Sequence, residues 1–251
     1  MKNGKGRRLL LLTVAAVCMF SAGKVLSHRL EMRAEAQHAE ELVELAVRPA
    51  PERAEESEAA VETAPIEVDF DALWAENPDV VAWLYCPDTP INYPIVQAAD
   101  NAYYLRRLLD GSRNVAGTLF MDYRNAADFA DWNSVVYGHN MTNGTMFGSL
   151  PKYKEQAYYD AHPQLYLLTP EKDYAIRVAA GFVTPADAPL YTAFSPDGEA
   201  REQLVGEWLT KSDFASESAL APEGKYITLS TCSYEYDNAR YVLIGVLEEL
   251  G

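Results

Sequence analysis

The stretch KYITLSTCSYEYDNARYVLIGVLE, residues 225–248, decides the fold. It contains two runs rich in β-branched and aromatic residues, 225–231 and 240–248, separated by a polar connection. This pattern predicts two strands joined as a hairpin. Cys232 stands where the first strand stops and Arg240 where the second begins. The hairpin would therefore carry Arg240 back towards Cys232.

Further strands are predicted upstream of this hairpin, separated by turn residues rather than by regular helices. About eight short strands with a few short helices favour a mainly β fold, a closed or nearly closed barrel with helical additions, over a doubly wound parallel sheet. Pro94 argues that its strand is an edge strand or a bulged one. The upstream strands are expected at 80–85, 91–96, 117–122, 134–139, 164–168 and 174–183, and the helices at 70–75, 101–109 and 199–209.

Charge is distributed unevenly along the 251 residues. The formal net charge is −16; since residues 1–30 contribute +6, the rest carries −22. So acidic a surface repels phosphate backbones, which excludes nucleic acid as an expected partner. The three cysteines form no C-x-x-C pair, and no acidic cluster suggests a calcium site, so we expect no metal and no cofactor. A disulfide between Cys86 and Cys232 stays open as an alternative.

The N-terminus has the pattern of an export signal or a membrane anchor. A basic segment, 1–8, precedes an apolar run that we take as a transmembrane signal-anchor over 9–26. Small residues at 21–23 leave a cleaved signal peptide as the alternative. Residues 27–65 read as an acidic extracytoplasmic tether, helical over 30–47 and solvated over 48–65, and 66–251 as the catalytic domain. Positive charge before the run places the N-terminus in the cytoplasm and the domain outside.

One histidine stands out among the four. His139 ends an apolar strand and precedes a glycine-containing loop, a position suited to a cleft. Taken singly, each candidate has a structural interpretation, because a buried cysteine usually acts as a small hydrophobic residue and Arg240 can pair with Glu235 or Asp237. Together they suffice for acyl transfer: a thiolate attacks, an imidazole moves protons, and a guanidinium stabilises the oxyanion.

Five stretches carry a resemblance to the class B sortases, which are cysteine transpeptidases. The resemblance covers roughly residues 66–248 and implies an eight-stranded sortase barrel with N-terminal helices and a helix before the cysteine strand, and catalysis by His139, Cys232 and Arg240. The matching stretches are TLSTC at 228–232, NARYVL at 238–243, VYGHNM at 136–141, INYPIVQ at 91–97 and GTLFMDYRN at 117–125.

The resemblance also implies a reaction and its partners. Cys232 would cleave a C-terminal sorting signal of secreted proteins through an acyl-thioester, which an amine of peptidoglycan or its precursor then resolves. Alternation along the strand puts Ser230 on the face of Cys232. Asn92, Thr231 and Tyr104 are further candidates for substrate binding. The loop 184–192 and the helix 199–209 are expected to set the choice of motif.

Three alternatives differ in chemistry or use. A sortase of this class can polymerise pilins, and a degenerate one would only bind peptides without cleaving them. An L,D-transpeptidase-like enzyme also uses histidine and cysteine, but its cysteine normally follows Ser-x-Gly and is trailed closely by arginine. Here Thr231 precedes Cys232 and Arg240 lies eight residues away, which disfavours that family.

Overall fold

The computed structural model describes residues 3–51 and 62–251. Eight strands close into one barrel in the order β10-β8-β7-β3-β4-β5-β6-β9, and β9 pairs again with β10. The closed, eight-stranded barrel predicted from the sequence is confirmed. The strands are β3 Val80–Tyr85, β4 Asn92–Val96, β5 Leu119–Met121, β6 Asn133–Tyr137, β7 Gln164–Leu168, β8 Asp173–Pro185, β9 Tyr226–Cys232 and β10 Ala239–Glu249.

Two of the strand pairings are parallel, β4 with β5 and β6 with β9, and the others are antiparallel. A closed barrel has no edge, so the edge strand expected from Pro94 is wrong. Pro94 is tolerated because only Ile95 and Val96 pair with β5, which leaves Pro94 without a ladder partner on that side. The register of β3 also shifts between Val80 and Ala82, opposite this part of β4.

The barrel interior is filled by alternating apolar side chains from the strands, among them Leu84, Ile95, Val136 and Leu229. Helix α4 (Gly198–Lys211) lies outside the barrel and packs Trp208 against β8, β9 and β10. This is the helix predicted before the cysteine strand, with Asp197 as its N-cap. The remaining short elements are α3 (Gln156–Ala161) and the 3-10 turns η1 (Tyr104–Arg106), η2 (Leu150–Lys154) and η3 (Pro189–Tyr191).

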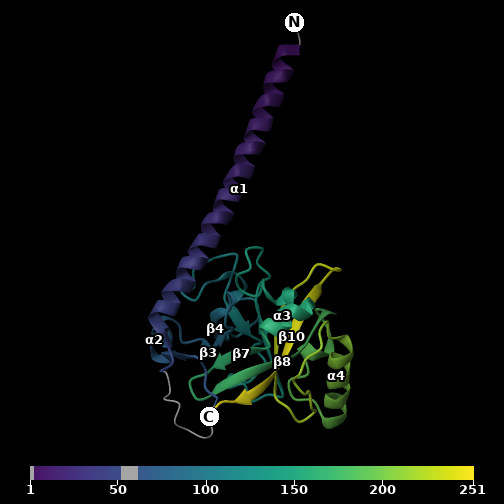
Figure 1. The fold of residues 1–251 in the computed structure, drawn as a ribbon. Helices are drawn as coiled ribbons and strands as arrows, with labels where there is room; N and C mark the ends of the chain where they lie inside the picture. Colours follow the sequence, from purple (N-terminus) through teal and green to yellow (C-terminus); the bar gives the residue numbers. More distant parts are fainter. Residues whose placement is uncertain (1–2, 52–61) are drawn as a thin grey trace.

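The N-terminal helix α1 (Asn3–Ala46) is a single unbroken element of 44 residues. Figure 1 shows it extending far from the barrel, with only its last part alongside the domain. By length and composition it is the one helix in the described ranges that could cross a membrane: a window within residues 10–46 has a mean hydropathy of 1.9 and is entirely exposed.

The segment expected to be a tether is partly docked. Leu42 and Ala46 are buried in an apolar cluster with Leu73 of α2 (Phe70–Glu76) and Trp83 of β3. Over these residues α1 is therefore a packed helix rather than a solvated linker, because its apolar face has a partner. Inside the predicted tether, β1 (Val47–Pro49) pairs with β2 (Ile66–Val68), which follows the end of the tether at residue 65. Residues 52–61 of the tether lie outside the described residues, and the segment boundaries stay predictions.

The helix predicted over 101–109 is wrong except for the single turn η1. The backbone of that turn and of the residues after it has other partners. Thr118 N–H donates to the carbonyl of Tyr104, and Arg107 bridges to Arg113. These bonds take the place of the hydrogen bonds of a helix. The local sequence pattern does not reveal them, so it predicted a helix that is too long.

Candidate active site

Strand pairing brings Cys232 and Arg240 together. Cys232 is the last residue of β9, and the antiparallel register places Arg240 of β10 directly opposite it. The connection between them closes tightly, with Ser233 N–H donating to the carbonyl of Ala239 at 3.0 Å and Asn238 at φ 61°. The proximity predicted from the hairpin is confirmed. Residues directly opposite in such a pair have Cβ atoms about 5 Å apart.

His139 reaches the same place from the other side of β9. Strand β6 runs parallel to β9 with Tyr137 aligned to Ser230, and the contact continues past the strand end. Gly138 N–H donates to the carbonyl of Ser230 at 3.1 Å, and Thr231 Oγ1 donates to the carbonyl of Gly138 at 2.8 Å. His139 therefore follows β6 to the level of Cys232.

A backbone carbonyl fixes the imidazole of His139. Its Nε2 lies 2.7 Å from the carbonyl oxygen of Leu105. Because a carbonyl can only accept, Nε2 carries the hydrogen, and Nδ1 is the nitrogen able to exchange a proton with a substrate. Gly138 is required beside it, since a Cβ there would lie 2.4 Å from Leu119 and 2.7 Å from Phe147.

The three residues line one pocket of about 270 Å³. Ser230 and Thr231 of β9 line it next to Cys232, as expected. Three polar residues from other segments complete its lining: Asn101, Tyr137 and Tyr191. The apolar part of the lining consists of Leu105, Phe120 and Ala186.

Two of the expected substrate-binding residues lie elsewhere. Asn92 accepts a hydrogen bond from the indole N–H of Trp83 at 2.7 Å and does not line the pocket. Tyr104 is buried, and its hydroxyl donates to Asp79 at 2.6 Å. Neither residue lines the pocket, and their roles in substrate binding stay predictions. Asn101, three residues before Tyr104, occupies the pocket instead.

The sequence analysis also missed Asn140 and Tyr191. Asn140 Nδ2 donates to the carbonyl of Cys232 at 2.9 Å, which holds the end of β9 in place. The Tyr191 and Ser230 hydroxyls lie 2.8 Å apart, and burial raises the pKa of Tyr191 to about 12. The signal for Asn140 was its position directly after His139; Tyr191 had no signal among 16 tyrosines.

Cys86 and Cys232 are both free thiols, so the alternative of a disulfide between them is wrong. Cys86 is buried inside the barrel, where desolvation raises the pKa of its thiol. A buried thiol with a raised pKa is a poor nucleophile. In the part of the chain that the structure describes, no group of three or more His, Cys, Asp or Glu side chains could hold a metal ion.

Comparisons with known proteins agree with this geometry. The family model for the sortase domain matches residues 84–248. Sortase B of Listeria monocytogenes is 35% identical over 173 residues, which cover 68% of this chain and 70% of the relative. The crystal structure of sortase B from B. anthracis in complex with AAEK1 has a TM-score of 0.72 at 33% identity, covering 89% of this chain and 99% of that one.

Two further structures, Staphylococcus aureus sortase B in complex with substrate and a sortase B complexed with triglycine, each have a TM-score of 0.68 at 26% identity. Each covers 72% of this chain, and 85% and 86% of the respective relatives. Family, class and fold thus coincide with the resemblance found in the sequence. The chain belongs to the sortase family of cysteine transpeptidases and, within it, to class B.

Proposed function

We propose that Cys232 is the nucleophile, His139 the general acid and base, and Arg240 the oxyanion donor of a sorting transpeptidase. The observation that supports this most directly is the register that sets Arg240 opposite Cys232, in a pocket that His139 also lines. A guanidinium is always charged and presents several N–H groups, so it suits the developing oxyanion of acyl transfer.

The reaction runs in two steps. The thiolate of Cys232 attacks the carbonyl carbon of the scissile peptide bond; that C–N bond breaks, and the leaving amine takes a proton from His139. An acyl-thioester remains on Cys232. A second amine then attacks the same carbonyl carbon and gives its proton to His139, while the C–S bond breaks and the thiolate leaves.

The substrates we propose are a secreted protein with a C-terminal sorting signal and an amine of peptidoglycan or its precursor. Support comes from the relatives: one structure is of Staphylococcus aureus sortase B in complex with substrate, and another is of a sortase B complexed with triglycine, a short peptide with a free amine. The pocket fits such partners, because it is open at the barrel end and mixes apolar and polar walls.

We place the enzyme at the cytoplasmic membrane, with α1 as an uncleaved anchor. The apolar stretch of α1 is fully exposed. Its side chains are unfavourable in water and would be favourable in the hydrocarbon core of a bilayer. Basic residues before it favour an N-terminus in the cytoplasm and a barrel outside. Fractionation of cells that express the full chain tests this, since a cleaved product in the medium would contradict it.

Mass spectrometry of the full chain in detergent tests the catalytic proposal. The probes are a library of fluorescence-quenched pentapeptides as acyl donors and triglycine as the amine. We expect an acyl adduct on Cys232 and a product joined to triglycine. Cys232→Ala should lose both, whereas the matched Cys86→Ala variant should keep both. If no peptide in the library gives an adduct with the wild-type chain, the proposal is wrong. If Cys232→Ala still cleaves a peptide, the nucleophile is a residue other than Cys232.

A further inference from the structure

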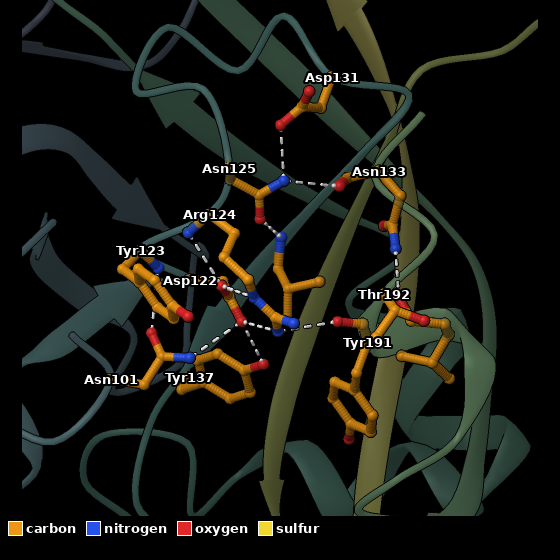
Figure 2. Close-up of polar contacts among 12 residues, drawn as sticks. Asn101, Asp122, Tyr123, Arg124, Asn125, Asp131, Asn133, Tyr137, Tyr191 and Thr192 are labelled. Carbon is orange, nitrogen blue, oxygen red and sulfur yellow. Dashed lines mark hydrogen bonds and ion pairs between the residues drawn. The ribbon is translucent and has the colours of Figure 1, made fainter. Parts of the chain in front are cut away.

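A buried carboxylate lies at the centre of a polar cluster beside the pocket. Asp122 follows β5 directly and is completely buried. One of its oxygens accepts from Asn101 Nδ2 and from the Tyr137 hydroxyl, both at 2.9 Å. Arg124 binds it through two nitrogens, each at 2.8 Å. Figure 2 shows these side chains converging on Asp122 from separate parts of the chain.

The same guanidinium makes a second connection. Arg124 Nη2 also donates to the carbonyl of Tyr191 in η3, at 3.1 Å. Its guanidinium carbon lies 4.9 Å from the ring centre of Phe194, which limits its movement. Arg124 thereby connects η3, which precedes α4, to Asp122 at the end of β5. Neither Arg124 nor Asp122 lines the pocket itself.

Three of the residues bound to this ion pair do line the pocket. Asn101, Tyr137 and Tyr191 come from three different segments, and each is bound to Asp122 or Arg124. Tyr191 continues the connection through its hydroxyl to Ser230, two residues before Cys232. One ion pair thus reaches the three polar residues of the wall that faces the catalytic strands.

We propose that Asp122 and Arg124 are positioning residues that set the shape of this wall and so determine which sorting peptide the pocket accepts. The proposal rests on the function proposed above and adds the residues that tune its selectivity. Asp122 is ionised for this role. Burial by itself would raise its pKa, but the fork of Arg124 and the donors of Asn101 and Tyr137 outweigh burial and lower it.

Stability alone does not call for this arrangement. A partly exposed ion pair contributes little to folding, and a buried one is often replaceable by apolar residues. The side chain of Arg124 is 38% exposed, yet its planar fork meets a carboxylate and a carbonyl at once. A lysine has the charge but no fork, so it cannot make all three contacts in this geometry.

Arg124→Lys in the full chain is the direct test, with the pentapeptide library and triglycine as probes. We expect KM for the best-cleaved peptide to rise about tenfold, kcat to change less than about twofold, and the order of preferred peptides to change. KM for triglycine and the rate at which a small methanethiosulfonate labels Cys232 should stay as in the wild type.

Arg177→Lys is the matched control. Arg177 also binds a carboxylate, that of Glu248 at 2.9 Å, but neither residue lines the pocket. Its KM and peptide preference should equal those of the wild type. A library profile that changes equally in Arg177→Lys and Arg124→Lys would overturn the proposal, because the effect would then not depend on the pocket wall.

A subtler variant guards against misfolding of Arg124→Lys. Tyr137→Phe removes only the hydroxyl that donates to Asp122, and it should raise KM about threefold in the same direction. Unchanged KM and preference in every variant that folds, or a fall in kcat at constant KM, would refute the positioning role. A wild-type chain that forms no adduct on Cys232 would instead refute the proposed function.

Discussion

The two walls of the pocket are built in different ways. Cys232 and Arg240 lie on adjacent strands, where backbone ladders fix their separation. The facing wall gathers Asn101, Tyr137 and Tyr191 from separate segments. Only Tyr137 lies on a strand next to β9, and side-chain hydrogen bonds to one ion pair join all three. We infer from this difference that backbone pairing positions the reactive residues, whereas the ion pair positions the residues that select the peptide. A change in one wall should therefore leave the other largely intact.

The largest effect is expected on the strand wall. Cys232→Ala removes the nucleophile, and no other cysteine of the described residues lines the pocket. We therefore expect kcat to fall by at least about a thousandfold. Cleavage of the best library peptide measures this. Binding of that peptide to the variant, measured by fluorescence anisotropy, should persist because the facing wall is unaltered. Loss of binding together with kcat would mean that the two walls are not separable.

Arg240→Lys tests the oxyanion role on the same wall. It keeps the charge but loses the planar set of N–H donors, so we expect kcat to fall about a hundredfold with KM little changed. Single-turnover formation of the acyl adduct on Cys232 measures the affected step. Arg177 lies on β8, which pairs with β10, but away from the pocket. Arg177→Lys should therefore behave as wild type. A KM effect without a kcat effect would assign Arg240 to substrate binding instead.

Asp122→Asn should destabilise the fold in a manner that depends on pH. Burial tends to raise the pKa of Asp122, but the donors led by Arg124 outweigh it and hold the folded-state pKa below the ordinary value of 3.8. Its contribution is therefore fully present above pH 3.8 and is lost as pH falls through the lower, folded-state pKa. We expect the variant to be about 2 kcal/mol less stable at pH 7.

Urea unfolding of both chains between pH 7 and pH 3 measures that difference. The gap between wild type and Asp122→Asn should narrow towards pH 3, because below pH 3.8 the unfolded wild-type chain takes up a proton that the folded carboxylate does not yet bind. A gap that stays constant over this range would show that the charge of Asp122 contributes nothing and that only its shape matters.

The smallest effect is expected for Asn140→Ala. It removes one donor from the carbonyl of Cys232 while leaving the β9–β10 ladder in place. We expect kcat/KM to fall about fivefold to tenfold with little change in Tm. Asn143→Ala, in the same loop but bonded only to Thr145, is the control. Equal losses in both variants would indicate a general effect of the loop.

The strand wall could be predicted from the sequence. Alternation and turn residues located the strands within a few positions, and a hairpin carries Arg240 back towards Cys232. His139 followed from its place at a strand end. Helix α4 was equally readable, because its N-cap Asp197 and its apolar face are local signals.

The facing wall could not be predicted, because its contacts join residues far apart in the chain. Asn101 and Asp122 are 21 positions apart, and Arg124 and Tyr191 are 67 apart. Nothing local distinguishes Asn101, which lines the pocket, from Asn92, which does not. The helix expected over 101–109 failed for the same reason, since partners distant in sequence claim its backbone.

Because α1 is one unbroken helix, it fixes both the distance and the rotation of the barrel relative to the apolar segment of the helix. A helix rises about 1.5 Å per residue and turns about 100°, so the 16 residues from Leu26 to the docked Leu42 set a height of about 24 Å and a fixed heading. In the proposed orientation, inserting two residues between these points would swing the pocket halfway round the axis. Inserting seven would restore the heading and add about 10 Å of height. Both insertions would change how the pocket is presented to its substrates.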